Sequence, residues 1–185
     1  MSFAAIKTGD ALSQDFEALF QEHWQLVFRA AYAITRHRQD AEDVLQSVFA
    51  NVLERGLTAD IRRHPERYLH RAAVNASLNV LRSRKRRRLV DGLDVQELPA
   101  NPGRAAASGD ERERDERQEQ LTEAMARLTP RALEILVLRY QRDFSDAQIA
   151  ALLGTSRGVI AVTLYRIRAR LRTLLRSAGS EGDKA

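Results

Sequence analysis

An acidic segment with few apolar residues divides this sequence into two parts. From Leu89 to Gln120 the chain has nine acidic and four basic residues, two of its four prolines and three of its nine glycines. Such a composition cannot build a core, so the segment is predicted to be a flexible acidic linker. The 88 residues before it and the 65 after it are each enough for one small domain.

Both flanking parts have the apolar periodicity of helices. In the first part, apolar residues recur at three- and four-residue steps between Phe16 and Ile34, which predicts an amphipathic helix with one broad buried face. We therefore expect an all-α fold: two small helical domains joined by the acidic linker. The predicted boundaries are residues 12–88 for the first domain, 89–120 for the linker and 121–176 for the second domain. The end of the linker can also be the first, solvated turns of a helix that continues past Gln120.

The helix that follows is predicted to begin at Asp40, a good N-cap residue. Pro65 suits the first turn of the next helix, because a backbone N–H at that position would have no acceptor within the helix. Residues 58–64 are expected to form the loop before this helix. The stripe expected to be buried on the helix that begins at Asp40 consists of Ala41, Val44, Leu45, Val48, Val52 and Leu53.

Positive charge is concentrated on both sides of the linker. The first part has fifteen basic and ten acidic residues and the second has eleven and six, so each carries a net charge of +5. Six of the seven residues from Arg82 to Arg88 are cationic, and a run this dense favours phosphate binding over a merely solvated helix end. Asn75 and Asn79 stand one turn apart just before it. They are either exposed side chains without a role or a pair of amides able to read base edges.

The second part contains a helix-turn-helix pattern. Thr129 and Pro130 begin one helix, Ser145 caps a short second helix, and Gly154 stands where a tight turn needs a left-handed residue. A long helix beginning near Ser156 follows, with arginines at alternating positions. This pattern predicts DNA binding, with a helical hairpin of basic surface as the alternative.

The remaining composition narrows the class of protein. There is no cysteine, which excludes disulfides and thiolate metal sites. We find no signal peptide, membrane span, catalytic triad, glycine-rich phosphate loop or metal-ligand spacing, so we expect a cytoplasmic protein that is not an enzyme and needs no cofactor or metal. The four histidines (His23, His37, His64 and His70) are predicted to be surface residues or satisfied ones.

Four segments, taken in order, resemble one known family. Residues 40–49, 68–82, 128–140 and 145–171 are similar to regions 2.2, 2.3–2.4, 4.1 and 4.2 of the bacterial extracytoplasmic-function (group IV) RNA polymerase sigma factors. The resemblance implies a promoter-specificity subunit that binds core RNA polymerase and promoter DNA and helps melt the minus-ten region. Family members are often held by an anti-sigma factor. No small-molecule substrate and no membrane insertion are implied.

The resemblance assigns the polar face of the helix over 40–55 to core polymerase. Asp43 and Gln46 become polymerase contacts, with Glu42, Ser47 and Phe49 beside them. A carboxylate there can form a charge-assisted bond with a cation of the partner and fix the register. At Ser47 the family usually has Glu, so one anchoring charge is missing.

The resemblance also assigns Asn75 to the minus-ten element, where a base of the non-template strand is turned out and read on its Watson–Crick edge. Tyr68 either stacks in the open strand or packs in the core, and the segment 58–64 is expected to complete the base pocket. The cationic run would hold duplex phosphates, which adds affinity without sequence information. The full predicted set is Tyr68, Arg71, Asn75, Asn79, Arg82, Arg84, Lys85, Arg86, Arg87 and Arg88.

The recognition helix departs most from the family. Where members commonly have Gly-Thr-Val-Lys-Ser-Arg, residues 158–163 are Gly-Val-Ile-Ala-Val-Thr, so two cations are lost. Recognition of the minus-thirty-five element is therefore either weaker or carried by Arg157, Thr163, Arg166 and DNA shape. Apolar contacts of Ala161 and Val162 with thymine methyls are a further route, which would favour an A·T-rich element. The predicted contacts are Ser156, Arg157, Ala161, Thr163, Arg166 and Arg168.

Two other readings of the sequence compete with the sigma factor. One is a self-sufficient helix-turn-helix transcription regulator, which would bind duplex DNA without polymerase. The other is an RNA-binding or nucleoid protein that uses the Arg82–Arg88 run alone. Under the sigma factor interpretation, the acidic linker is expected to hold the two basic domains in a compact state that binds DNA less tightly.

Overall fold

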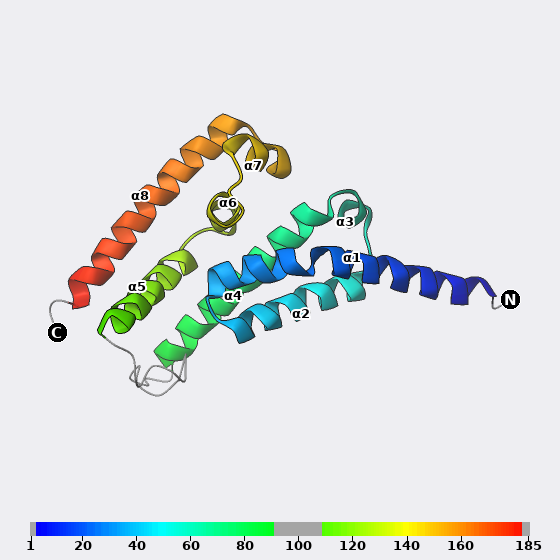
Figure 1. Cartoon of the computed structure of the whole chain (residues 1–185), viewed down its shortest axis with the longest axis horizontal. Coiled ribbons are helices and arrows are strands. Elements are labelled where there is room, and N and C mark those ends of the chain that lie inside the picture. Colours follow the sequence, from blue (N-terminus) through cyan, green and yellow to red (C-terminus); the bar gives the residue numbers. More distant parts are fainter. Residues whose placement is uncertain (1–2, 91–108, 183–185) are drawn as a thin grey trace.

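The computed structural model describes residues 3–90 and 109–182, and these residues form helices without any strand (Figure 1). The predicted all-α fold is therefore confirmed. In chain order the helices are α1 (Phe3–Thr35), α2 (Arg38–Arg55), α3 (Ala59–Arg63), α4 (Pro65–Val90), α5 (Gly109–Ala126), α6 (Pro130–Gln141), α7 (Asp146–Leu153) and α8 (Arg157–Gly182).

The first half is a bundle in which α1, α2 and α4 pack on one another, with the short α3 joining α2 to α4 (Figure 1). The apolar face predicted for α1 is confirmed, because Val27, Ala31 and Ile34 are fully buried. Leu69 and Leu78 of α4 complete the same core. Helix α1 begins well before the predicted start of the domain at residue 12.

Two local predictions about the first half are wrong. Helix α2 begins at Arg38, and its N-cap is His37, whose Nδ1 accepts a hydrogen bond from the backbone N–H of Asp40 at 3.4 Å. Asp40 thus lies in the first turn, where its carboxylate suits the positive end of the helix. The segment 58–64 is not a loop: most of it forms α3, capped by the Thr58 hydroxyl, which accepts from Ile61 N–H.

The helix starts and the glycine turn predicted for the second half are confirmed, whereas α8 continues to Gly182, past the predicted end of the domain at residue 176. The Thr129 hydroxyl caps α6 ahead of Pro130, and Ser145 caps α7 in a capping box with Gln148. Gly154 ends α7 with φ 64° and ψ 45°, a left-handed conformation that a side chain would strain. The Ser156 hydroxyl then accepts from Val159 N–H at the start of α8.

Helix α5 crosses the predicted boundary between linker and second domain. It begins at Gly109 and runs to Ala126, so the last part of the predicted linker is helical, as the alternative reading of that segment proposed. Glu113 and Arg117 are exposed and form an ion pair one turn apart. The rest of the predicted linker, residues 91–108, lies outside the described residues.

The two halves pack against each other. Helix α6 contacts both α1 and α4, and α5 lies against α4 on one side and α8 on the other (Figure 1). No single helix among the described residues is long and apolar enough to cross a membrane. The segments Asp146–Leu153 and Arg157–Ser177 pass that test only as a pair, with a bend of 109° between them.

Candidate polymerase and nucleic-acid interfaces

The polar face of α2 is turned to solvent. Asp43, Gln46 and Ser47 are exposed, and Asp43 accepts a hydrogen bond from the side-chain amide of Gln39 at 3.3 Å. Glu42 is half-buried and paired with Arg38 at 2.8 Å. The face therefore presents a carboxylate and an amide to solvent. The contacts with Gln39 and Arg38 orient the carboxylates of Asp43 and Glu42 before a partner binds.

Two apolar residues of α2 do not lie where the sequence placed them. Phe49 is only 4% exposed and packs edge-on against Phe16 and Phe20 of α1, so its side chain belongs to the core and leaves the predicted polymerase-contact set. Leu53, predicted to be buried, is 63% exposed. It lies seven residues after Gln46 and so on the same face, which makes it an apolar residue of this surface that the sequence reasoning missed.

Helix α4 carries a single exposed stripe of cations and amides. Arg71, Asn75, Asn79, Arg82 and Arg86 follow one another at four- and three-residue steps, and all five are exposed. Such spacing places them on one face of a helix. Tyr68, one turn before Arg71, is half-buried and packs against the core, which leaves part of its ring for another contact.

The other cations of the run point elsewhere. Arg84 faces α2 and forms an ion pair with Asp40 at 2.5 Å, and Arg87 is exposed away from the stripe. Lys85 Nζ contacts Glu123 Oε1 of α5 at 2.5 Å. Hydrogen bonds, first of all the one from Lys85, lower the pKa of Glu123. The side chain of Arg88 lies outside the described residues.

The helix-turn-helix is assembled by α7 and α8. Ile149 and Leu153 of α7 are buried against Ile160 and Leu164 of α8, and the small Ala150 is buried between the two helices. This packing fixes α8 as the outward helix of the pair, the one that such motifs place in the major groove.

The outer face of α8 holds most of the predicted contacts. Arg157, Ala161 and Arg166 are exposed, as is Ser156 before the helix, while Thr163 is half-buried. Arg168 is exposed but donates to the Tyr140 hydroxyl at 2.8 Å.

Three further exposed apolar residues lie on α8, of which Val162 was expected to touch thymine methyls, whereas Val159 and Tyr165 were not among the predicted contacts. Val159, Val162 and Tyr165 recur every third residue, and Tyr165 is 71% exposed. The signal was present in the sequence, because these residues alternate with the buried stripe of Ile160, Leu164 and Ile167. The exposed face of α8 is thus more apolar than the predicted contacts alone suggested.

Comparisons with known proteins identify both halves. The family model for Sigma-70 region 2 matches residues 19–87, and the one for Sigma-70, region 4 matches residues 118–171. The ECF RNA polymerase sigma factor SigE of Mycolicibacterium smegmatis is 30% identical over 183 residues, which covers 94% of this chain and 67% of that protein. The RNA polymerase sigma-E factor of Streptomyces coelicolor is 28% identical over 158 residues and covers 85% and 84% of the two chains.

The chain belongs to the extracytoplasmic-function RNA polymerase sigma factors. It is a transcription initiation factor, and the predicted family and function are confirmed. Both matched regions are sigma factor regions and relatives matched over most of the chain are sigma factors, which favours the sigma factor over a self-sufficient regulator. A solved complex of the sigma factor RpoE with the anti-sigma factor NepR from Bartonella quintana is also similar, with 19% identity, a TM-score of 0.48, and coverage of 88% of this chain and 98% of that chain.

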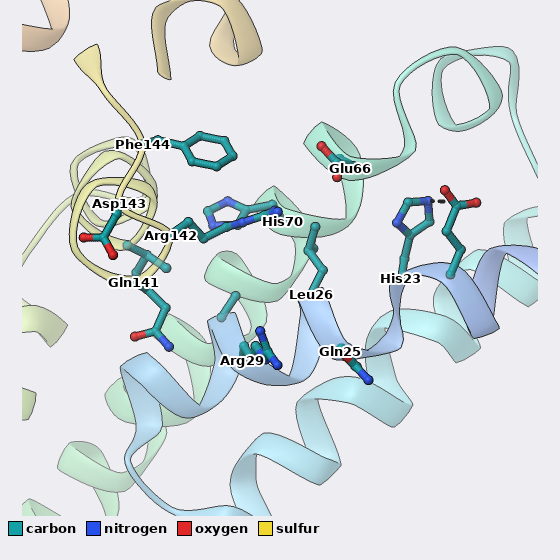
Figure 2. Close-up of a pocket in the computed structure, with 13 residues that line it drawn as sticks. His23, Gln25, Leu26, Arg29, Glu66, His70, Gln141, Arg142, Asp143 and Phe144 are labelled. Atoms are coloured by element: carbon teal, nitrogen blue, oxygen red, sulfur yellow. Dashed lines mark ion pairs between the residues drawn. The ribbon is translucent and has the colours of Figure 1, made fainter. Parts of the chain in front are cut away.

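The halves of this sigma factor enclose a cavity of about 460 Å³ between α1, α4 and the end of α6 (Figure 2). His70 is buried in its wall, next to Arg142 and Phe144 of the second half. Neither ring nitrogen has a hydrogen-bond partner among the described residues, so the prediction of a surface or satisfied histidine is wrong for His70. Burial, with a smaller contribution from the Arg142 charge, lowers the pKa of His70 to about 4.

The other histidines have simpler surroundings. His37 is the N-cap of α2, His64 is exposed, and His23 is buried with its ring 3.8 Å from Glu22. Across the described part of the chain, no cluster of histidine and acidic side chains is arranged to hold a metal ion.

Proposed function

We propose that the two halves of the sigma factor divide promoter recognition. The first domain, residues 12–88, binds core polymerase through α2 and recognises and opens the minus-ten element through α4. The second domain, residues 121–176, binds the minus-thirty-five element through α8. The single exposed stripe of cations and amides on α4 carries this proposal.

On α2, Asp43 and Gln46 make the central polymerase contacts, with Glu42 and Ser47 beside them. The exposure of Asp43 and Gln46 supports this role, because a partner can reach both. A carboxylate that meets a partner cation fixes the register of docking. Leu53 adds apolar surface to the same contact.

On α4, the residues of the stripe have different tasks. Asn75 reads a base that has left the stack, because an amide can both donate to and accept from a Watson–Crick edge. Asn79 and the exposed part of Tyr68 lie beside it on the same face. Arg71, Arg82 and Arg86 hold phosphates of the same strand and of the adjoining duplex.

On α8, the reading face combines Arg157 and Arg166 with apolar side chains. Methyl groups at Ala161 and Val162 fit thymine methyls, so we propose an upstream element rich in A·T pairs. The proposed sigma factor has no catalytic site and works in the cytoplasm, where it meets polymerase and the chromosome. An anti-sigma factor, expected from the resemblance, stays a prediction.

The test of the polymerase contact is a paired substitution on α2. Asp43→Arg with Gln46→Ala should abolish co-purification with core RNA polymerase. The pair of changes replaces the anchoring carboxylate with a cation, which repels the cation expected on the partner, and it removes the amide. The matched control is Glu17→Arg with Gln21→Ala, an acid and an amide that are exposed one turn apart on α1 and bonded to each other at 2.8 Å. The control should bind as the wild type does. Retained binding by the α2 variant would contradict the proposed contact.

A further inference from the structure

A second cavity, mostly apolar, lies where the end of α1 meets α5, α6 and α8, and its volume is about 460 Å³. Small-molecule sites in proteins are typically apolar cavities of about 300–1,000 Å³ with a few polar groups. The size of this cavity falls in that range. Its apolar wall is formed by Leu121 and Met125 of α5, Leu136 of α6, and Leu171 and Leu175 of α8.

The charged side chains at this cavity are all cationic. Arg36, which follows α1, and Arg168 and Arg172 of α8 line it, and no acidic side chain of the described residues does. Arg168 is engaged by the Tyr140 hydroxyl, whereas Arg172 is exposed and has no hydrogen-bond or ion-pair partner in the described part of the chain. Cations around an apolar space attract a ligand that has both an anionic group and an apolar body.

The side chain of Gln118 provides a second polar group at the same cavity. Its carbonyl oxygen accepts a hydrogen bond from Arg36 at 3.2 Å, which fixes the orientation of the amide. The amide nitrogen is then buried and has no hydrogen-bond partner among the described residues. Because a buried donor without an acceptor costs free energy, this nitrogen favours a ligand that brings one.

A carboxylate supplies what these groups lack. One of its oxygens can accept from the Gln118 amide while the carboxylate forms an ion pair with the Arg36 guanidinium. The apolar wall then suits a hydrocarbon chain attached to that carboxylate. A cavity of this size takes one drug-sized molecule, so it fits a single acyl chain and not the two chains of a bilayer phospholipid.

We propose that this cavity binds a medium-chain fatty acid. The acyl chain packs against the leucines and Met125, and the carboxylate is held by Arg36 and Gln118, with Arg172 as a further cation. The proposed contacts with polymerase and promoter DNA use other residues. The site therefore neither depends on the proposed function nor competes with it.

The first test compares ligands. Decanoate is titrated into the full-length protein by calorimetry at neutral pH, below its micelle-forming concentration, and should bind at one site. Octanoate, two methylenes shorter, should bind about tenfold more weakly, because less apolar surface is buried. Decyltrimethylammonium has the same chain length but a cationic head group, and it should bind at least about tenfold more weakly than decanoate because it meets three arginines.

The second test places the site on the chain. Arg36→Gln should weaken decanoate binding about tenfold through loss of a charge-assisted bond, and Gln118→Met about fivefold through loss of the amide donor. The matched control is Arg176→Gln, which removes an exposed arginine of α8 that does not line the cavity. The control should bind decanoate as the wild type does.

Thermal unfolding shows whether the variants keep their fold. Arg36 is exposed and Gln118→Met removes a buried donor that has no acceptor, so both variants should unfold at about the temperature of the wild type. Equal affinities of Arg36→Gln, Gln118→Met and Arg176→Gln for decanoate would overturn the proposed site. Equal affinities of the wild type for decanoate and decyltrimethylammonium, or no binding of decanoate, would overturn it as well.

Discussion

Phe49 and Leu53 stand four residues apart on α2, yet one is buried and the other is exposed. Four residues advance an α-helix by about 400°, so the second side chain is displaced by about 40° around the axis. Phe49 lies within reach of Phe16 and Phe20 of α1, and Leu53 lies beyond the covered sector, on the side of Gln46. Sequence reasoning grouped Leu53 with Val52 because both are apolar. Which of the apolar side chains of α2 is buried depends on where α1 packs, and this cannot be read from α2 alone.

This difference predicts opposite phenotypes for two alanine substitutions. Leu53→Ala should leave the free energy of unfolding within about 0.5 kcal/mol of wild type, because the side chain is exposed. It should weaken core polymerase binding by up to about tenfold, since burying a leucine side chain against a partner is worth about 1.5 kcal/mol or more. Phe49→Ala should cost about 3–5 kcal/mol of stability through the cavity it leaves. Denaturant unfolding and polymerase titration measure the two effects, and a Leu53→Ala protein that binds normally would remove Leu53 from the interface.

At the scale of the element, the helix boundaries were predictable where they are set by residues adjacent in the sequence. The caps at Thr129 and Ser145 and the left-handed Gly154 are local chemistry, which a short stretch of sequence contains. The start of α2 was missed because a histidine, an uncommon cap, takes that role in place of Asp40. The stripe on α4 follows from helical spacing, but the buried environment of His70 could not be read from α4 alone, because part of its wall belongs to the second half.

The buried His70 makes the stability of the folded protein depend on pH. Its pKa is about 4 in the folded protein against 6.5 for an ordinary histidine, so the unfolded chain takes up a proton first as the pH falls. The folded state should therefore lose stability below about pH 7, by about 2 kcal/mol at pH 5, and the loss should level off near pH 4. Glu22, Glu66 and Asp143 also line the cavity and contribute their own titration.

The control isolates the histidine. His70→Phe removes the buried imidazole and should flatten the fall in stability between pH 7 and pH 5, while His64→Phe, the same change at an exposed histidine, should keep it. Unfolding by urea at a series of pH values measures both. A wild-type slope in His70→Phe would show that other groups cause the pH dependence.

At the scale of the whole molecule, the sequence predicted two basic domains but not how they meet. The contacts of Arg82 and Lys85 join residues 38 to 46 positions apart, on helices whose relative placement no local pattern encodes. The charge distribution along the sequence predicted that the acidic linker holds the two basic domains together. In the structure, Arg82 and Lys85 are instead bound by Glu123 and by two carbonyl groups at the end of α5. The family region that each half matches was predictable, because each half carries its own motif.

The central claim is that this protein directs RNA polymerase to particular promoters, with α4 reading the minus-ten element. In vitro transcription of genomic DNA by core polymerase, with the protein added and start sites mapped, tests it most directly. We predict new start sites that share a minus-ten element, a changed base preference at one or two of its positions with Asn75→Ala, and a uniform loss at all promoters with Arg86→Ala. Start sites identical to those of core polymerase alone would contradict the account.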